Sequence, residues 1–125
     1  MISVICPIYN EEKYIAKCIE SILEQDYPKD DLEVIFVDGM STDRTRGIVA
    51  EYANTYPFIR MVDNPDRIVP PAMNIGIRLA KGEIIIRLDA HAIFPSDYFS
   101  ELTKNLIELD ADNVGGVCRT LPVDD

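Results

Sequence analysis

The sequence predicts an α/β protein with three layers, in which a mainly parallel sheet has helices on both faces. Short apolar runs rich in β-branched residues alternate with segments whose apolar residues recur every three to four positions. Strands separated by such helices pair in parallel through right-handed crossovers, which leave helices on both faces. The 125 residues, 47% of them hydrophobic, suffice for a single domain with its own core, so we predict one domain over residues 1–125.

The first half of the chain contains two strand–helix pairs. An apolar run over residues 2–5 predicts the first strand, and apolar positions at helical spacing over residues 11–25 predict the first helix. A second strand is predicted over residues 32–37. Turn and capping residues over positions 38–43 end that strand, and a second helix follows from Thr45.

The second half continues the alternation. A third strand is predicted over residues 58–62, and a third helix over residues 71–80, with proline near its start and glycine shortly after its end. A fourth strand is predicted over residues 83–88. A serine can cap a fourth helix over residues 96–109, and a final strand is predicted over residues 113–121.

Charge, cysteine content and the lack of long apolar stretches indicate which partners and which compartment to expect. Acidic residues outnumber basic ones 22 to 12, the net charge is −10, and no basic run occurs, so we expect no nucleic-acid partner. Cys6, Cys18 and Cys118 are too widely spaced for a disulfide framework or a zinc site, which favours reduced thiols used in packing. The sequence shows no signal peptide and no apolar stretch of about 20 residues, so we expect a soluble, cytoplasmic chain.

Acidic residues follow two of the predicted strands, at the edge where parallel sheets bind ligands. Asp38 follows the second strand, and Asp89 and His91 follow the fourth. A carboxylate and a second oxygen or nitrogen donor can together bind a divalent cation. The oxygens of a diphosphate would then complete the coordination shell of the ion. All-oxygen surroundings favour Mg²⁺, whereas an imidazole favours Mn²⁺. Such an ion would neutralise charge on a departing diphosphate.

Missing motifs exclude two nucleotide-binding classes, and one other class stays open. No GxGxxG follows the first strand, which excludes a dinucleotide-dependent dehydrogenase, and no GxxxxGK[ST] loop occurs, which excludes P-loop phosphotransferases. A phosphorylation receiver domain has this length and layering. Its usual acidic pair directly after the first strand is missing, but Glu11 and Glu12 lie near enough to keep this alternative.

Several stretches occur in a fixed order along the chain. They are SVICPIYNEE (residues 3–12), SIL with Gln25 (21–25), VDGMSTDRT (37–45), NIG with AKGE (74–83) and LDAH (88–91). Together they resemble the N-terminal part of family 2 glycosyltransferases, which have the Rossmann-like GT-A fold of nucleotide-diphospho-sugar transferases. The variant around RLDAHA, with PPAMN before it, is most similar to exopolysaccharide glycosyltransferases of the succinoglycan-biosynthesis type.

The resemblance implies transfer of a hexosyl group from a nucleotide diphosphate sugar, with a UDP-sugar as the expected donor. The acceptor would be a saccharide or a lipid-linked molecule in exopolysaccharide or cell-envelope polysaccharide synthesis, and the reaction would invert the anomeric centre. In this family the general base comes from a second half of the domain. We therefore expect this chain to be the donor-binding half of a longer enzyme, and the alternative is a nucleotide-binding module that is inactive by itself. Membrane segments in the rest of the parent would place it at the inner face of the membrane.

The resemblance also implies the site residues. Pro7, Ile8 and Tyr9 would line the uracil side of the pocket. Glu11 would lie beside the ribose, and Asp38 would approach the base or ribose. Asp89 and His91 would hold Mn²⁺ or Mg²⁺, with His91 in place of the last carboxylate of the family's DxD motif. The complete set implied for the donor is Pro7, Ile8, Tyr9, Glu11, Asp38, Arg67, Asn74 and Asp89.

Simpler interpretations of four residues remain open. Asp38 could only cap the turn that follows it, and Glu11 could be a first-turn residue favoured by the helix dipole. Tyr9 could cover the end of the core, as amphipathic tyrosines often do. His91 could be an ordinary polar loop residue, or it could contact a phosphate without any metal.

Overall fold

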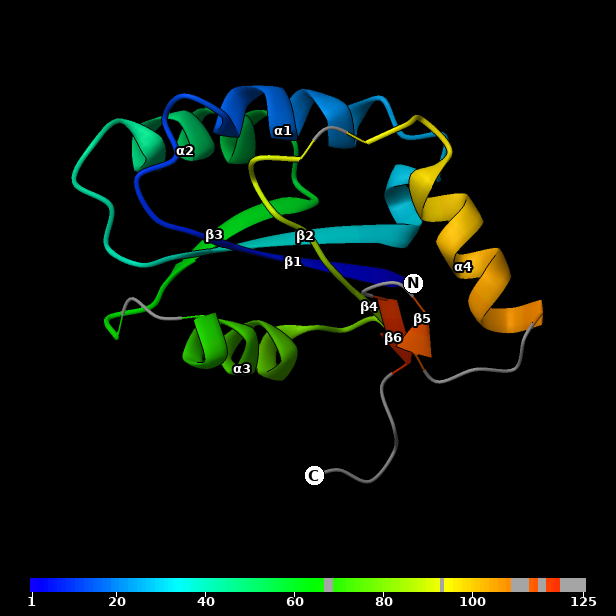
Figure 1. The fold of residues 1–125 in the computed structure, drawn as a ribbon. Helices are drawn as coiled ribbons and strands as arrows, with labels where there is room; N and C mark the ends of the chain where they lie inside the picture. Colours follow the sequence, from blue (N-terminus) through cyan, green and yellow to red (C-terminus); the bar gives the residue numbers. More distant parts are fainter. Residues whose placement is uncertain (67–68, 93, 109–112, 115–116, 120–125) are drawn as a thin grey trace.

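Strands and helices alternate along most of the chain (Figure 1). The structure is a computed structural model that describes residues 1–66, 69–92, 94–108, 113–114 and 117–119. A short 3₁₀ turn at Lys29–Asp31 precedes the second strand. The elements are β1 (Ile2–Ile8), α1 (Ile15–Leu23), β2 (Leu32–Asp38), α2 (Thr45–Thr55), β3 (Ile59–Asp63), α3 (Val69–Leu79), β4 (Ile84–Arg87), α4 (Tyr98–Glu108), β5 (Asn113–Val114) and β6 (Val117–Arg119).

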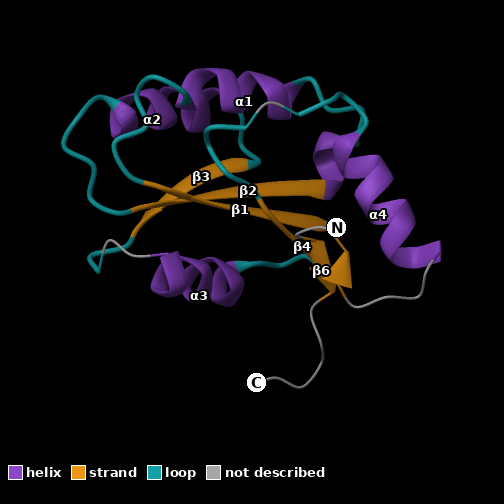
Figure 2. Ribbon diagram, in the orientation of Figure 1, coloured by secondary structure: helices purple, strands orange, loops and turns teal. Residues whose placement is uncertain are grey.

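The strands form one sheet in the order β3-β2-β1-β4-β6-β5, and the first four pair in parallel. Helices α1 and α2 lie on one face of the sheet and α3 on the other (Figure 2). The core is accordingly divided in two. The larger part packs under α1, α2 and α4, and the smaller part packs against α3. The predicted three-layer, mainly parallel α/β fold is confirmed.

The order of the strands in the sheet excludes a receiver domain. A receiver sheet has the order 2-1-3-4-5, in which the third strand pairs with the first. Here β1 pairs with β2 and β4, and β3 lies at the edge beside β2. This is the 3-2-1-4 arrangement of nucleotide-binding sheets. The receiver alternative is therefore wrong.

The C-terminal strand predicted over residues 113–121 is also wrong. The structure has two short strands instead, β5 and β6, which pair antiparallel with each other, while β6 also pairs antiparallel with β4. In the sequence, Gly115 and Gly116 separate them, a pair that is typical of a two-residue hairpin. The single-strand interpretation overlooked this signal.

Two boundaries near the first loop differ from the prediction, and both shape the candidate site. The first helix begins at Ile15 instead of Glu11, because the Glu11 carbonyl accepts hydrogen bonds from the N–H groups of Tyr14 and Ile15 in a turn before the helix. Strand β1 runs through Pro7 to Ile8. Since β4 pairs only with the first residues of β1, the missing N–H of Pro7 faces a position that β4 does not reach.

Two glycines let α3 and the turn after it pack closely against β1. A Cβ on Gly76 would lie 2.5 Å from Cγ2 of Ile5, and a Cβ on Gly82 would lie 2.6 Å from the carbonyl oxygen of Met1. The N–H of Gly82 also donates to Oγ of Ser3 at 2.7 Å. These contacts place the start of β4 against β1.

The thiols of Cys6 and Cys18 are free and buried, which confirms their predicted role in packing. A hydrogen bond with Cys18 and burial both raise the pKa of the Cys6 thiol. The side chain of Cys118 lies outside the described residues. None of the helices in the described part of the chain combines the length and the apolar character that crossing a bilayer requires.

Candidate functional site

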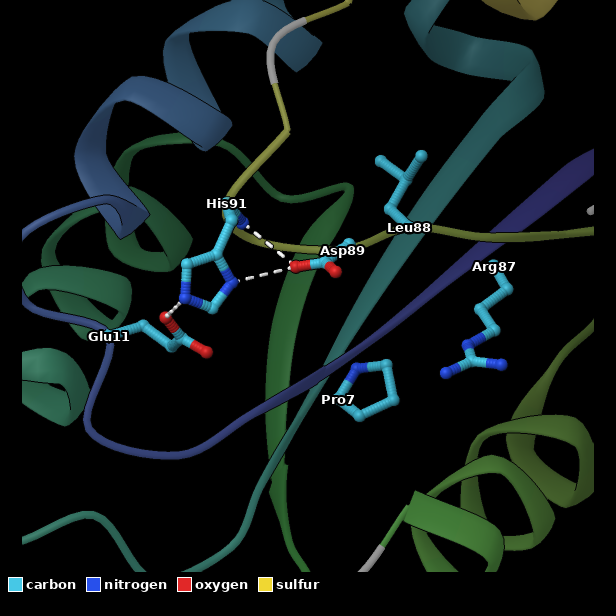
Figure 3. Close-up of a pocket in the computed structure, with 6 residues that line it drawn as sticks. All are labelled: Pro7, Glu11, Arg87, Leu88, Asp89 and His91. Carbon is cyan, nitrogen blue, oxygen red and sulfur yellow. Dashed lines mark hydrogen bonds and ion pairs between the residues drawn. The ribbon is translucent and has the colours of Figure 1, made fainter.

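A pocket lies at the carboxyl edge of the sheet and is lined by residues at the ends of β1 and β4 and in the loops that follow them. The pocket has a volume of about 190 Å³. Its position agrees with the rule that open α/β sheets bind ligands beyond the carboxyl ends of their strands. Figure 3 shows the lining residues, which are Pro7, Glu11, Arg87, Leu88, Asp89 and His91.

The imidazole of His91 lies between two carboxylates in this pocket (Figure 3). Its Nδ1 is 2.8 Å from Oδ1 of Asp89, and its Nε2 is 3.1 Å from Oε1 of Glu11. The backbone N–H of His91 donates to the same Asp89 oxygen at 3.0 Å. The ring of Tyr14 packs beside the imidazole, with 4.7 Å between ring centroids. His91 is therefore part of an ordered group and not an isolated loop residue.

This arrangement shifts three pKa values. The hydrogen bond to Asp89, followed by the charge of Glu11, raises the pKa of His91. Hydrogen bonds from the backbone N–H and then the ring of His91 lower the pKa of Asp89. Partial burial raises the pKa of Glu11, although the charge of His91 opposes this shift. The shifts of His91 and Asp89 share one cause, the hydrogen bond between the two side chains.

Arg87 supplies a cation on the other side of the pocket. It is the last residue of β4 and points to the α3 side of the sheet, because Ile85, two residues earlier, belongs to the core against α3. Its side chain is exposed and forms no hydrogen bond or close ion pair with another described residue. In Figure 3, Pro7 lies between Arg87 and His91. The sequence interpretation missed Arg87, although a charged residue directly after three buried isoleucines marks a strand end.

The loops after β1 and β2 are joined by reciprocal hydrogen bonds. The N–H of Asn10 donates to Oγ of Ser41 at 2.8 Å, and the N–H of Thr42 donates to Oδ1 of Asn10 at 2.8 Å. Asn10 and Met40, on the two loops, have positive φ values of 50° and 66°. Asparagine adopts positive φ more readily than most residues, whereas for Met40 this conformation has a cost that its surroundings offset. The two loops are therefore joined to each other by hydrogen bonds.

A second set of hydrogen bonds fixes the backbone at Glu11. Its N–H donates to Oγ1 of Thr45 at 2.8 Å, and that hydroxyl donates to Oδ1 of Asp43. The N–H of Arg44 donates to Oε1 of Glu12 at 2.9 Å. The STDRT stretch therefore acts on the pocket indirectly, by holding the loop that carries Glu11.

Asp38 does not line the pocket. Its side chain is fully buried, and its carboxylate accepts hydrogen bonds from the N–H and hydroxyl of Ser41 and from Arg46, whose Nη1 is 2.6 Å away. The same Arg46 nitrogen is 2.9 Å from Asp63. In this structure Asp38 organises the turn after β2, as the simpler interpretation expects, and its predicted contact with the base or ribose stays a prediction.

The remaining predicted donor contacts are dispersed. Ile8 is buried in the core, at 4% exposure, so it does not form a pocket wall. Tyr9 is exposed at the end of β1, and Asn74 is exposed on α3, but neither lines the pocket. Arg67 lies outside the described residues. Of the predicted residues, the structure brings together Pro7, Glu11, Asp89 and His91.

The end of α1 holds the segment that follows the site. Oγ of Ser21 lies 3.2 Å from the carbonyl oxygen of Phe94 and donates to it. The side-chain amide of Gln25 donates to the carbonyl of Pro95 at 2.6 Å and accepts from the N–H of Phe99 at 2.9 Å. Ser21 and Gln25, two residues of the resemblance, therefore position the chain after His91.

The donor atoms of the pocket fit a cation whose shell a ligand completes. Within the described ranges, no three His, Cys, Asp or Glu side chains converge as a complete protein metal site. The pocket does offer one imidazole nitrogen and carboxylate oxygens, which are donors that Mn²⁺ accepts. Mg²⁺ and related ions often take only one or two carboxylates and obtain their other oxygens from phosphates and water. The residues present fit such a shared site.

Comparison with known proteins identifies relatives along nearly the whole chain. The model of the Glycosyl transferase family 2 matches residues 3–124. A dolichyl N-acetyl-alpha-D-glucosaminyl phosphate 3-beta-D-2,3-diacetamido-2,3-dideoxy-beta-D-glucuronosyltransferase of Methanococcus voltae is 41% identical over 109 residues, which are 86% of this chain and 33% of that protein. The succinoglycan biosynthesis protein ExoA of Rhizobium meliloti is 34% identical over 120 residues, which are 94% of this chain and 36% of that protein. The chain thus spans about a third of these two relatives.

Solved structures agree with this result. The mannosyltransferase PcManGT from Pyrobaculum calidifontis, in complex with GDP-Man and Mn²⁺, has a TM-score of 0.79 and 39% identity, covering 84% of this chain and 32% of that one. TarS 1-349 of S. aureus, in complex with UDP-GlcNAc, has a TM-score of 0.78 and 30% identity, covering 98% of this chain and 37% of that one. The fold expected from the resemblance is therefore confirmed.

Proposed function

Because the chain belongs to glycosyl transferase family 2, we propose that its parent protein transfers a hexosyl group from a nucleotide diphosphate sugar to a saccharide or lipid-linked acceptor. We assign this transfer to exopolysaccharide or cell-envelope polysaccharide synthesis, with inversion. The matched segments make up 33% and 36% of the two relatives. We therefore assign donor binding to these residues and the general base and acceptor site to other parts of the parent.

The observation that carries this proposal is the pocket with Arg87 on one side of Pro7 and His91 on the other. In a chain of net charge −10, an anionic ligand needs local positive charge. Arg87 supplies a planar group of N–H donors that matches phosphate oxygens. The His91 side offers donors for a divalent cation, and together the two sides suit a diphosphate.

Each lining residue has a role in this proposal. Arg87 binds and orients the diphosphate, while Pro7 and Leu88 give the pocket an apolar wall that excludes water. The joined loops after β1 and β2 hold Glu11 in place. When bound, Mn²⁺ or Mg²⁺ would neutralise the negative charge that develops on the departing diphosphate.

We propose UDP as the nucleotide and test GDP beside it. One solved relative holds UDP-GlcNAc and covers 98% of this chain, whereas another holds GDP-Man and is 39% identical to it. Tyr9, at the exposed end of β1, is our candidate for stacking on the base. The donor contacts of Arg67 and Asn74 remain predictions. The free, buried thiols of Cys6 and Cys18 are consistent with a reducing compartment, so we propose a cytoplasmic location.

Calorimetric titration tests donor binding directly. UDP and GDP are each titrated into the chain with and without Mn²⁺, and we expect UDP to bind more tightly with the ion. Loss of one charge-assisted contact costs about 1.5–3 kcal/mol. Arg87→Ala is therefore expected to weaken nucleotide binding by about tenfold or more. The matched control is Arg78→Ala, because Arg78 is an exposed arginine in the last turn of α3 and is expected to leave binding unchanged.

Two outcomes would overturn the donor-site proposal. One is the absence of any nucleotide binding by the folded wild-type chain, with or without the metal ion. The other is an equal loss of affinity in Arg87→Ala and Arg78→Ala, because that result would indicate a general effect of charge and not a contact in the pocket.

A further inference from the structure

The two nitrogens of the His91 ring face different carboxylates. Nδ1 lies 2.8 Å from Oδ1 of Asp89, whereas Nε2 lies 3.1 Å from Oε1 of Glu11 (Figure 3). The lone-pair directions of these two nitrogens diverge in the plane of the ring. One metal ion bound by His91 can therefore take one of these carboxylates as its neighbour, but not both.

Nδ1 of His91 is already bonded to a neighbouring carboxylate within the same turn. Oδ1 of Asp89 accepts from both the ring and the backbone N–H of His91, and the carbonyl of Asp89 accepts from the N–H of Ala92 in the same turn. Metal-binding histidines commonly donate their second ring N–H to a carboxylate, which fixes the orientation and tautomer of the ring. Asp89 is in the position of that orienting carboxylate, and the nitrogen left for a metal is Nε2.

The Nε2 side faces a carboxylate that is already held in place. The Glu11 side chain is only 14% exposed, whereas that of Asp89 is 73% exposed. The backbone of Glu11 is fixed by a hydrogen bond to Thr45, the first residue of α2. Nε2 of His91 and Oε1 of Glu11 are 3.1 Å apart, so these two donor atoms already converge on one point of the pocket.

We propose that Nε2 of His91 and the carboxylate of Glu11 are the protein ligands of the divalent cation, and that Asp89 is a positioning residue which fixes the imidazole. This inference rests on the proposed function, because phosphate oxygens of the donor would complete the shell. It changes the assignment from the sequence, in which Asp89 was the partner ligand of His91 and Glu11 lay beside the ribose.

Proton NMR of the chain can identify the ligating nitrogen, because His91 is the only histidine. Mn²⁺ broadens nearby protons, and the effect falls steeply with distance. An ion on Nε2 lies equally near the two ring protons, Hε1 and Hδ2, whereas an ion on Nδ1 lies much nearer to Hε1. Titration with Mn²⁺ in the presence of UDP is expected to broaden both ring protons to a similar extent. Broadening of Hε1 alone, or of neither proton, would overturn the proposal.

Variants separate the ligand from the positioning residue. Glu11→Gln is expected to weaken Mn²⁺ binding by at least tenfold, and Glu51→Gln, the same change at an exposed position on α2, is expected to leave it within about twofold. Asp89→Ala is expected to weaken Mn²⁺ binding by about 10- to 100-fold, as loss of an outer carboxylate does. In that variant both ring protons should still broaden once the ion is bound. Unchanged Mn²⁺ affinity in Glu11→Gln would contradict the assignment.

The tautomer of His91 tests the positioning role of Asp89. A general loss of structure would not produce a defined change from one tautomer to the other. In wild type, the ¹⁵N shifts of neutral His91 are expected to show the proton on Nδ1, and Asp89→Ala is expected to move the population towards Nε2–H. No change in the tautomer would contradict this role. Repeating the Mn²⁺ titration without UDP separates the two proposals: broadening of both ring protons without nucleotide binding would retain the ligand assignment while the donor proposal fails.

Discussion

The backbone N–H of Glu11 donates a hydrogen bond of 2.8 Å to the hydroxyl of Thr45, across 34 residues of sequence. This contact joins the loop after β1 to the start of α2 and fixes the residue whose carboxylate faces His91. Thr45 is buried, and its hydroxyl donates in turn to Asp43. Thr45 therefore affects the pocket indirectly, because it holds Glu11 in position.

Thr45→Val is expected to loosen Glu11 while keeping the shape of the side chain. The variant leaves the Glu11 N–H without its acceptor, which costs about 1–3 kcal/mol of unfolding free energy for a buried group. We also expect the His91 ring protons to shift in NMR spectra and UDP binding in the presence of Mn²⁺ to weaken. Thr45→Ser retains the hydroxyl and should restore binding, and Thr55→Val, at the exposed end of α2, is the control. Wild-type binding by Thr45→Val would show that this contact does not position Glu11.

The pKa of His91 provides a second prediction. Asp89, followed by Glu11, raises it above its ordinary value of about 6.5. Because the folded-state pKa is the higher one, the stabilising contribution of His91 is fully present below the unfolded value and disappears as the pH rises through the folded value. An NMR titration of the ring protons in metal-free protein should give a midpoint above 6.5, and Asp89→Ala should lower it. A wild-type midpoint at or below 6.5 would show that these contacts do not form in solution.

The sequence contained most of the fold, because strand and helix patterns depend on neighbours that are close along the chain. The apolar runs at residues 2–5, 32–37 and 84–86 coincide with β1, β2 and β4. The hairpin of β5 and β6 was missed because the residues on both sides of Gly115 and Gly116 were interpreted as one continuous strand. The antiparallel pairing with β4 could not be predicted, because it depends on long-range contacts.

The site was only partly predictable, for a related reason. Asp89 and His91 could be located because they follow a buried strand. For Asp38 the sequence suggested the capping of the turn but not the ion pair with Arg46, because Arg46 has the appearance of an exposed helix residue and the pair forms only after β2 and α2 pack. Arg87 was missed because it was counted as part of the predicted strand. The register of β4 against β1 shows that β4 ends at Arg87, beside the pocket.

Removing the buried Asp38 carboxylate should affect stability more than ligand affinity. Asp38→Ala leaves Arg46 and Ser41 without their shared acceptor, and disruption of a buried pair costs about 3–5 kcal/mol. Because the side chain of Arg46 is 35% exposed, solvent compensates in part, and we expect a loss near the lower end of that range. Urea unfolding measures the change, with Asp97→Asn as the exposed control, expected within about 0.5 kcal/mol of wild type. A large loss of UDP affinity without loss of stability would instead support a direct contact between Asp38 and the donor.

The close packing of α3 on β1 predicts opposite effects for two glycine-to-alanine changes. A Cβ on Gly76 would lie 2.5 Å from Cγ2 of Ile5, so Gly76→Ala forces a buried side chain to move and should reduce the unfolding free energy by about 1–3 kcal/mol. Gly47 lies within α2, and a Cβ added there would have no atom within 4 Å, so Gly47→Ala should increase stability by up to about 1 kcal/mol through helix propensity. Urea unfolding of both variants measures the two changes. Equal effects would mean that α3 does not approach Ile5 as closely as the structure shows, and the placement of β4 and Arg87 that depends on this packing would then need revision.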